Sequence, residues 1–288
     1  MSTPKGSRND DREGLVRLHD GRALGYLESG PSSSRTLLYF GSSRIEARIL
    51  FPAAQAQGIR IIGLDRPGIG VSQFQEGRTV LDWPADVTEI ADLFGIDRFA
   101  VIGLSSGAPF AISCAHTMPR RLIACGIVSG VGPTRVRIYQ RFPWLLTQSM
   151  RLMGSYFRAK HKAEQAVERF TRAWPEADRI ALQSPGIRDI WVDSLLEAFR
   201  QGWQGYTYDT LLAEAKPWGF NLGEVTFRSI FLWHGELDKD VPISMATATE
   251  AQLLHCRATY YPDQGHISVI VNNGREILRT LFDGTFQP

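Results

Sequence analysis

The chain has few cysteines, no long hydrophobic run and almost no net charge, and each of these absences argues against a class of protein. Its three cysteines, Cys114, Cys125 and Cys256, lack metal-site spacing and are odd in number, so neither a zinc site nor a disulfide framework is expected. No apolar run approaches the ~20 residues that cross a bilayer. A net charge of +2 over 288 residues gives no electrostatic basis for binding nucleic acid. We therefore expect a cytoplasmic protein with no membrane span, metal or cofactor. The sequence does not indicate its oligomeric state.

Strand patterns alternate with helical patterns over residues 14–132 and 227–288. Strands that are apolar on both faces and joined by helices are typical of a mostly parallel sheet covered on both sides. We therefore predict an α/β fold with an eight-stranded, mostly parallel sheet. Residues 1–13 are polar and are expected to be a disordered tail, not a signal peptide.

Residues 133–226 separate two strands by a stretch too long for a loop in a compact domain. Its helical patterns cover residues 136–146, 149–172, 175–183 and 187–201. An insertion between two strands emerges at the carboxyl edge of the sheet, so we predict a helical cap over that edge. Most of its aromatic residues are expected to form the cap's own core, and a minority to line an apolar substrate pocket. The predicted pocket residues are Trp144, Tyr156, Trp191 and Trp203 from the insertion, with Phe40, Gly41 and Ile267 from the core.

The apolar run of residues 99–104 ends in Gly-x-Ser-x-Gly at residues 103–107, and a small-residue helical pattern follows. A strand, a sharp turn with Ser at its tip and a helix form a nucleophile elbow. Ser105 is expected to adopt a strained backbone conformation that costs ~1–3 kcal/mol, and the glycines keep side chains away from it. The same five-residue pattern also occurs by chance in loops, so its partners decide the interpretation.

A serine nucleophile needs a base, and the base needs a third group to orient it. His266 follows the last strand pattern, which places it at the same sheet edge as Ser105. The acid follows the strand before that one, where Asp238 is favoured over Asp240. Asp240 is interpreted as a turn-forming or helix-capping carboxylate. Asp263 is the weakest candidate, because it lies only three residues before His266 in the same loop.

Taken together, these motifs resemble those of the α/β-hydrolase superfamily with a serine nucleophile and a cap domain. The matching stretches are residues 103–107, Asp-x-Pro-Gly-x-Gly-x-Ser at residues 65–72, the acid turn of residues 234–242, and Gly-His at residues 265–266. They span nearly the whole chain in the family's order. Relatives that open epoxides or remove halides would carry Asp at position 105, so that chemistry is disfavoured.

The resemblance implies an oxyanion hole made by two backbone N–H groups, those of Ser106 and Ser42. The second loop departs from the family pattern, because residues 40–43 read Phe-Gly-Ser-Ser where relatives usually have His-Gly-x. Losing one oxyanion donor costs ~2.7–4 kcal/mol. Arg44 and Arg66 are candidates to contact a ligand carboxylate, although an arginine in such a position is more often a packing or solvated residue.

Three functions remain open from the sequence. The first is a serine hydrolase that cleaves an ester, lactone or thioester, or a C–C bond, of an apolar small molecule. The second is a cofactor-free lyase, cyclase or isomerase of a natural-product pathway, which the altered oxyanion loop favours. The third is a ligand-binding protein on a hydrolase scaffold, which the complete set of Ser105, Asp238 and His266 argues against.

Overall fold

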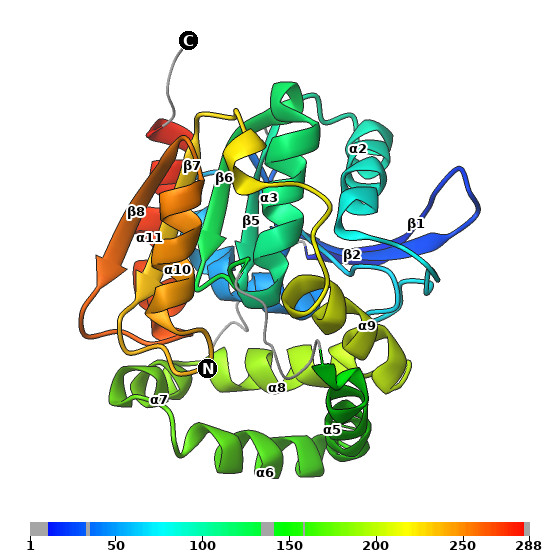
Figure 1. Cartoon of the computed structure of the whole chain (residues 1–288), viewed down its shortest axis with the longest axis vertical. Coiled ribbons are helices and arrows are strands. Elements are labelled where there is room, and N and C mark those ends of the chain that lie inside the picture. The colour runs from blue at the N-terminus through cyan, green and yellow to red at the C-terminus, as the bar shows by residue number, and fades with distance from the viewer. Residues whose placement is uncertain (1–10, 33–34, 134–140, 158, 285–288) are drawn as a thin grey trace, which may run out of the picture.

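The computed structural model describes residues 11–32, 35–133, 141–157 and 159–284 (Figure 1). They form an eight-stranded sheet with the order β1-β2-β4-β3-β5-β6-β7-β8. The strands β3 to β8 run parallel, and β1 and β2 add an antiparallel hairpin at one edge. The bounds are β1 Arg12–Arg17, β2 Ala23–Ser29, β3 Thr36–Phe40, β4 Arg60–Leu64, β5 Phe99–Leu104, β6 Leu122–Val128, β7 Ile230–Gly235 and β8 Cys256–Tyr261. The predicted mostly parallel, eight-stranded α/β sheet is confirmed.

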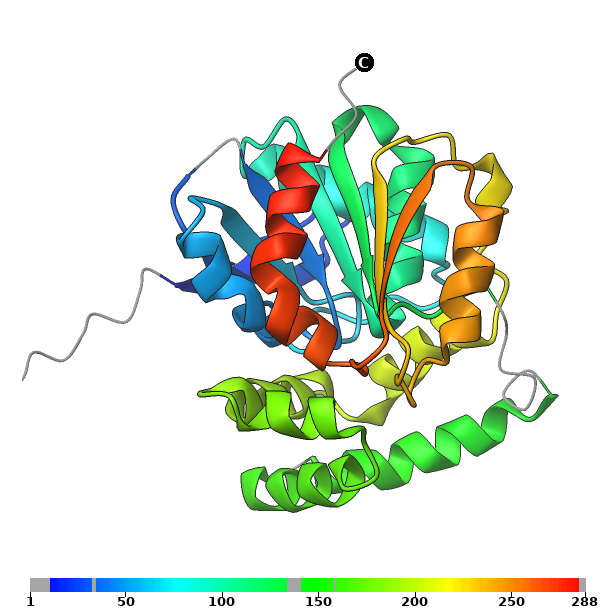
Figure 2. The same ribbon diagram turned by 90° about the vertical axis from the view of Figure 1, so that its left-hand side faces the viewer.

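Helices cover both faces of the sheet, as Figures 1 and 2 show from two directions. One face carries α2 (Trp83–Leu93), α3 (Ala108–Thr117) and α10 (Ile243–Gln252), and the other carries the 3-10 helix η1 (Arg44–Leu50), α1 (Phe51–Gln55) and α11 (Ser268–Asp283). Neighbouring residues of the central strand β5 point to opposite faces, so Val101 joins one apolar cluster and Ile102 the other. Burial on both faces explains why these strands are continuous apolar runs.

The described residues between β6 and β7 form five helices, which lie below the carboxyl ends of the parallel strands (Figure 2). They are α5 Pro143–Tyr156, α6 Lys160–Thr171, α7 Glu176–Gln183, α8 Ile187–Ala198 and α9 Trp203–Glu214. The helices α7, α8 and α9 are nearest the sheet, whereas α5 and α6 form an outer layer. The pattern expected as one helix over residues 149–172 is divided between α5 and α6, and α9 extends beyond the predicted patterns. Part of the pattern at residues 136–146 lies outside the described residues. We refer to α5–α9 as the helical insertion.

Buried ion pairs join the helical insertion to the core. Arg44 binds the Asp65 carboxylate at 2.5 Å and also pairs with Glu197 of α8. The Asp209 carboxylate of α9 accepts bonds from Arg66 at 2.6 Å and from Arg78 at 2.5 Å, all three side chains being buried. The two arginines considered as ligand contacts are therefore paired with carboxylates of the chain itself.

The first strand begins at Arg12, two residues before the predicted start of the folded core at residue 14. Most of the expected tail lies outside the described residues. Within the described ranges, no helix combines the length and the apolar character that a membrane crossing requires.

Candidate active site

Ser105 lies at the turn between β5 and α3, in the 3-10 turn η3 (Ser105–Gly107) that also contains Ser106. Its φ of 53° is in the left-handed region, which a non-glycine residue adopts at a cost of ~1–3 kcal/mol. A Cβ atom at Gly103 would lie 2.4 Å from the Gly107 carbonyl oxygen, and one at Gly107 would lie 2.0 Å from the Phe40 carbonyl oxygen. Both glycines of the motif are therefore required by close backbone approach.

His266 follows β8 and is only 4% exposed. Its Nδ1 lies 2.8 Å from Asp238 Oδ2, and the other Asp238 oxygen accepts the backbone N–H groups of Asp240 at 2.9 Å and Val241 at 2.8 Å. In the neutral imidazole, Nδ1–H then donates to Asp238 and Nε2 is the basic nitrogen. This geometry favours Asp238 as the orienting acid, whereas Asp263 is exposed on the surface.

The loop after β6 touches both the serine and the histidine. Val131 N–H donates to the Ser105 carbonyl oxygen at 3.1 Å, and Ser129 Oγ donates to the His266 carbonyl oxygen at 2.8 Å. Ser129 has a φ of 44°, so a second strained non-glycine residue adjoins the site. Strained residues cluster where surrounding structure holds a functional geometry.

Carboxylates dominate the electrostatics around the imidazole. Burial lowers the pKa of His266, but the charges of Asp238, Asp240 and Asp178 outweigh it and raise this pKa to about 9. The environment therefore stabilises the imidazolium, which is the form that a base reaches after it accepts a proton from serine.

The loop predicted to supply the second oxyanion donor is bonded to a buried carboxylate. Ser42 N–H, the expected oxyanion donor, donates to Glu46 Oε2 at 2.8 Å. Glu46 is 1% exposed and its Oε2 also accepts the Tyr39 hydroxyl at 3.3 Å. A Cβ atom at Gly41 would lie 1.8 Å from Glu46 Oε2, so only glycine admits the carboxylate here. Burial raises the pKa of Glu46, and the Ser42 N–H bond and the nearby His266 oppose that shift.

The family model of the alpha/beta hydrolase family matches residues 35–280. The chain belongs to the alpha/beta hydrolase family. The esterase from Exiguobacterium antarcticum superposes with a TM-score of 0.72 at 14% identity, over 94% of this chain and 98% of that one. The enol-lactonase from Burkholderia xenovorans LB400 gives 0.71 at 16% identity, over 94% and 98%. At these identities the similarity shows the fold alone. No curated protein sequence matches the chain.

In this alpha/beta hydrolase, a cavity of about 150 Å³ adjoins the nucleophile turn. Its lining among the described residues is Ser105, Val131, Gly132, Glu214, Asp240, Val241 and Met245. Burial raises the pKa of Glu214 to about 7. Sequence patterns did not single out Glu214 or Glu46, because neither belongs to a motif and both reach the site only through folding.

None of the seven predicted pocket residues is among the lining residues of this cavity, and their role in substrate binding stays a prediction. Trp144 and Tyr156 are 58% and 41% exposed on α5, in the outer layer of the helical insertion. Trp191 packs against Trp174 with ring centroids 5.8 Å apart, in a cluster that also buries Ile267. The remaining three are Trp203 in the insertion's own apolar cluster, Phe40 packed against Trp83, and Gly41 beneath Glu46. The aromatic rings of Trp191, Trp203 and Phe40 therefore pack within apolar clusters, and the sequence does not distinguish such packing from substrate contact.

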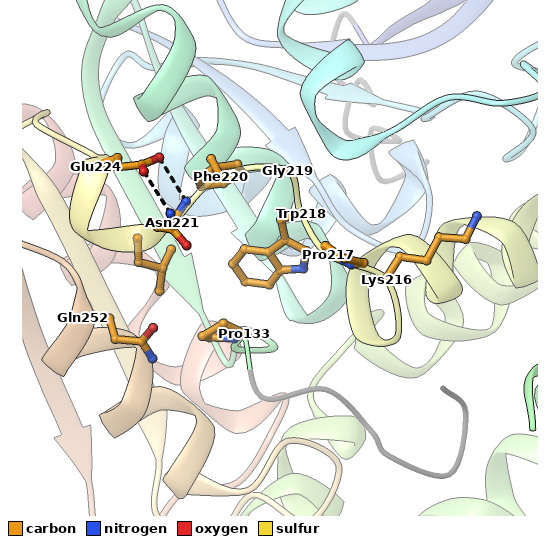
Figure 3. Close-up of a pocket in the computed structure, with 10 residues that line it drawn as sticks. Pro133, Lys216, Pro217, Trp218, Gly219, Phe220, Asn221, Glu224 and Gln252 are labelled. Atoms are coloured by element: carbon orange, nitrogen blue, oxygen red, sulfur yellow. Dashed lines mark hydrogen bonds between the residues drawn. The ribbon is translucent and has the colours of Figure 1, made fainter. Parts of the chain in front are cut away.

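A second hollow of about 420 Å³ lies where the chain returns from the helical insertion to the core (Figure 3). Trp218, Pro133 and Gln252 surround it, and Glu224 there accepts bonds from Asn221. None of Ser105, Asp238 and His266 is among its lining residues. Of these three residues, Ser105 is among the lining residues of the smaller cavity.

Proposed function

We propose that this hydrolase uses Ser105, His266 and Asp238 to cleave an ester, lactone or thioester bond of an apolar small molecule. The observation that carries the proposal is the 2.8 Å bond between His266 Nδ1 and Asp238. The other Asp238 oxygen accepts the N–H groups of Asp240 and Val241, which line a cavity together with Ser105. Cleavage of a C–C bond is a close variant that uses the same residues.

In the proposed reaction, His266 Nε2 takes the Ser105 proton as Oγ attacks the carbonyl carbon. The imidazolium is stabilised by Asp238 and returns the proton to the leaving group, which departs and leaves an acyl-serine. Water then attacks the acyl-serine with the same base, and the acid is released. Ser106 N–H, in the turn after the nucleophile, is the first oxyanion donor, and Ser42 N–H is the second once Glu46 releases it.

The small cavity favours substrates with a short acyl group next to the scissile bond. Its lining combines apolar Val131, Val241 and Met245 with the carboxyl groups of Glu214 and Asp240. We expect a small, largely apolar acyl part and no tolerance for an anionic group beside the carbonyl, because two carboxyl groups already lie there.

A non-hydrolytic lyase, cyclase or isomerase is the second candidate. It is favoured by the bond between Ser42 N–H and Glu46, which occupies a donor that ester hydrolysis uses. In that case His266 acts as a base on a substrate C–H or O–H bond, and Ser105 binds the substrate without forming an acyl-enzyme.

Turnover of p-nitrophenyl esters of increasing acyl length separates these candidates. We expect hydrolysis of short acyl esters that falls as the chain lengthens, and none by Ser105→Ala. Absence of turnover across the whole ester and lactone panel by the folded wild type would contradict the hydrolase proposal. Activity that survives Ser105→Ala would contradict the assigned nucleophile.

A further inference from the structure

The carboxylate of Asp178, in the helical insertion, accepts several hydrogen bonds from the segment that contains His266. Asp178 Oδ2 accepts the His266 backbone N–H at 2.8 Å. Asp178 Oδ1 accepts the N–H groups of Ile267 at 3.1 Å and Ser268 at 2.8 Å, and also the Ser268 hydroxyl at 2.7 Å. A side chain of α7 therefore takes four hydrogen bonds from three consecutive residues about ninety positions away in the sequence.

The burial of Asp178, the N–H groups around it and the space beside Gly265 all favour this contact. Asp178 is 1% exposed, and within the described ranges no basic side chain forms an ion pair with it. Its charge is met instead by the N–H groups at the start of α11, where a negative group is favourable. A Cβ atom at Gly265 would lie 2.2 Å from Asp178 Oδ2, so the glycine before His266 leaves room for the carboxylate.

We propose that Asp178 is a positioning residue for His266, so that the catalytic base is in place only while α7 is docked on the core. This inference rests on the proposed function of the site. Asp178 holds the His266 N–H from the insertion side, while Ser129 Oγ holds the His266 carbonyl from the β6 side. The ring is fixed between them by Asp238. The negative charge of Asp178 also favours the imidazolium formed during attack.

Other charged groups face the histidine as well, so the charge of Asp178 adds to an existing field. Those that act on His266 are Asp238 and Asp240 from the loop after β7, His234 at the end of β7, Glu46 from η1, and Asp178 from α7. Only Asp178 belongs to the helical insertion, so it can be changed without touching the acid turn.

Asp178→Asn tests the inference, because it keeps the shape and one acceptor oxygen but removes the charge and one acceptor. We expect kcat for the best ester to fall about 10- to 100-fold, as for a base displaced by a fraction of an ångström. KM should stay within about twofold, since the substrate cavity is untouched. The His266 ring, followed by NMR titration, should lose its proton at lower pH than in the wild type, because a negative neighbour is gone.

Gln201→Leu is the matched control. Gln201 Nε2 also ties the insertion to the core, through the Gly70 and Ser72 carbonyl oxygens at 2.8 Å each, but it makes no contact with the His266 segment. We expect it to lower the melting temperature without moving the His266 titration or kcat. Equal loss of kcat in both variants with an unmoved His266 titration would overturn the proposal, because it would indicate general loosening of the insertion.

Gly265→Ala reaches the same contact from the core and provides a second variant should Asp178→Asn not fold. Its methyl group should displace the Asp178 carboxylate and lower kcat in the same way. In an Asp178→Ala background the methyl group meets no carboxylate, so the second change should cost little more. Full additivity would contradict the inference. Wild-type protein without esterase activity would overturn the proposed function alone, since the NMR titration still tests whether Asp178 acts on His266.

Discussion

The two sides of Ser105 are built in opposite ways. On the His266 side, carboxylates accept hydrogen bonds from the histidine: Asp238 orients the ring through Nδ1, and Asp178 holds the backbone N–H. On the Ser42 side, a carboxylate accepts the N–H that the proposed reaction uses as its second oxyanion donor. In the proposed site, the same chemical group therefore supports the base on one side and occupies an oxyanion donor on the other.

In the proposed reaction, the hydrogen bonds on the His266 side can stay as they are, whereas the bond between Ser42 and Glu46 must break to free the oxyanion donor. On the base side, the bond to Asp238 already orients the ring, and the proposed reaction requires only that His266 lose its proton, because its pKa is raised to about 9. The oxyanion side needs Glu46 to release Ser42 N–H, or else it works with Ser106 N–H alone. A single missing donor costs ~2.7–4 kcal/mol in the transition state, so this step can set the rate.

The largest expected loss of activity comes from a substitution on the His266 side of Ser105. Asp238→Asn removes the acceptor that fixes the imidazole tautomer, and we expect kcat/KM to fall about 10⁴-fold. Asp240→Asn is the matched control, because Asp240 lies two residues away and lines the cavity without bonding the ring. It should cost no more than about tenfold, since it removes one charge near the imidazolium. Steady-state kinetics of both variants rank them, and the reverse ranking would contradict the assignment of the acid.

The next effect is on pH dependence. His266 must be neutral to accept a proton, and its pKa is raised to about 9 by the surrounding carboxylates. We therefore expect kcat/KM to rise about tenfold per pH unit from neutral pH and to level off above about pH 9. A plateau that already begins at pH about 6.5, the ordinary value for histidine, would show that these carboxylates do not act on the base.

The smallest expected change in activity comes from a substitution on the Ser42 side. Glu46→Gln keeps the size of the side chain but removes its charge, and a neutral acceptor holds an N–H roughly 1 kcal/mol less tightly. We expect kcat for esters to rise about fivefold, with little change in KM, because Ser42 N–H is released more easily. Single-turnover acylation rates measure this step directly. A fall in acylation would mean that Glu46 assists the reaction, which would favour the non-hydrolytic candidate.

The sequence predicted the parts of the molecule that local patterns control. Short motifs and apolar runs predict the succession of strands along the chain. They also predict the steric role of Gly103 and Gly107 and the chain order of Ser105, Asp238 and His266. The family assignment is confirmed by the match over residues 35–280. The catalytic roles of the three residues stay predictions, and the geometry supports them.

Contacts between distant segments could not be predicted in the same way. Asp178 reaches His266 across nearly ninety residues, and nothing in its own neighbourhood distinguishes it from a surface carboxylate at a helix start. Glu46 lies only four residues from Ser42, but its turn toward that N–H depends on the room left by Gly41. The sequence could not separate the aromatic residues that pack within the helical insertion from any that contact substrate, because packing and substrate binding require the same residue types.

Covalent labelling by a fluorophosphonate probe tests the central claim most directly, because the probe reacts with a serine only when a neighbouring base activates it. We predict stoichiometric labelling that mass spectrometry assigns to Ser105, faster at pH 9 than at pH 7 and absent in Ser105→Ala. Labelling of another serine, or none of the folded wild-type protein at either pH, would contradict the account.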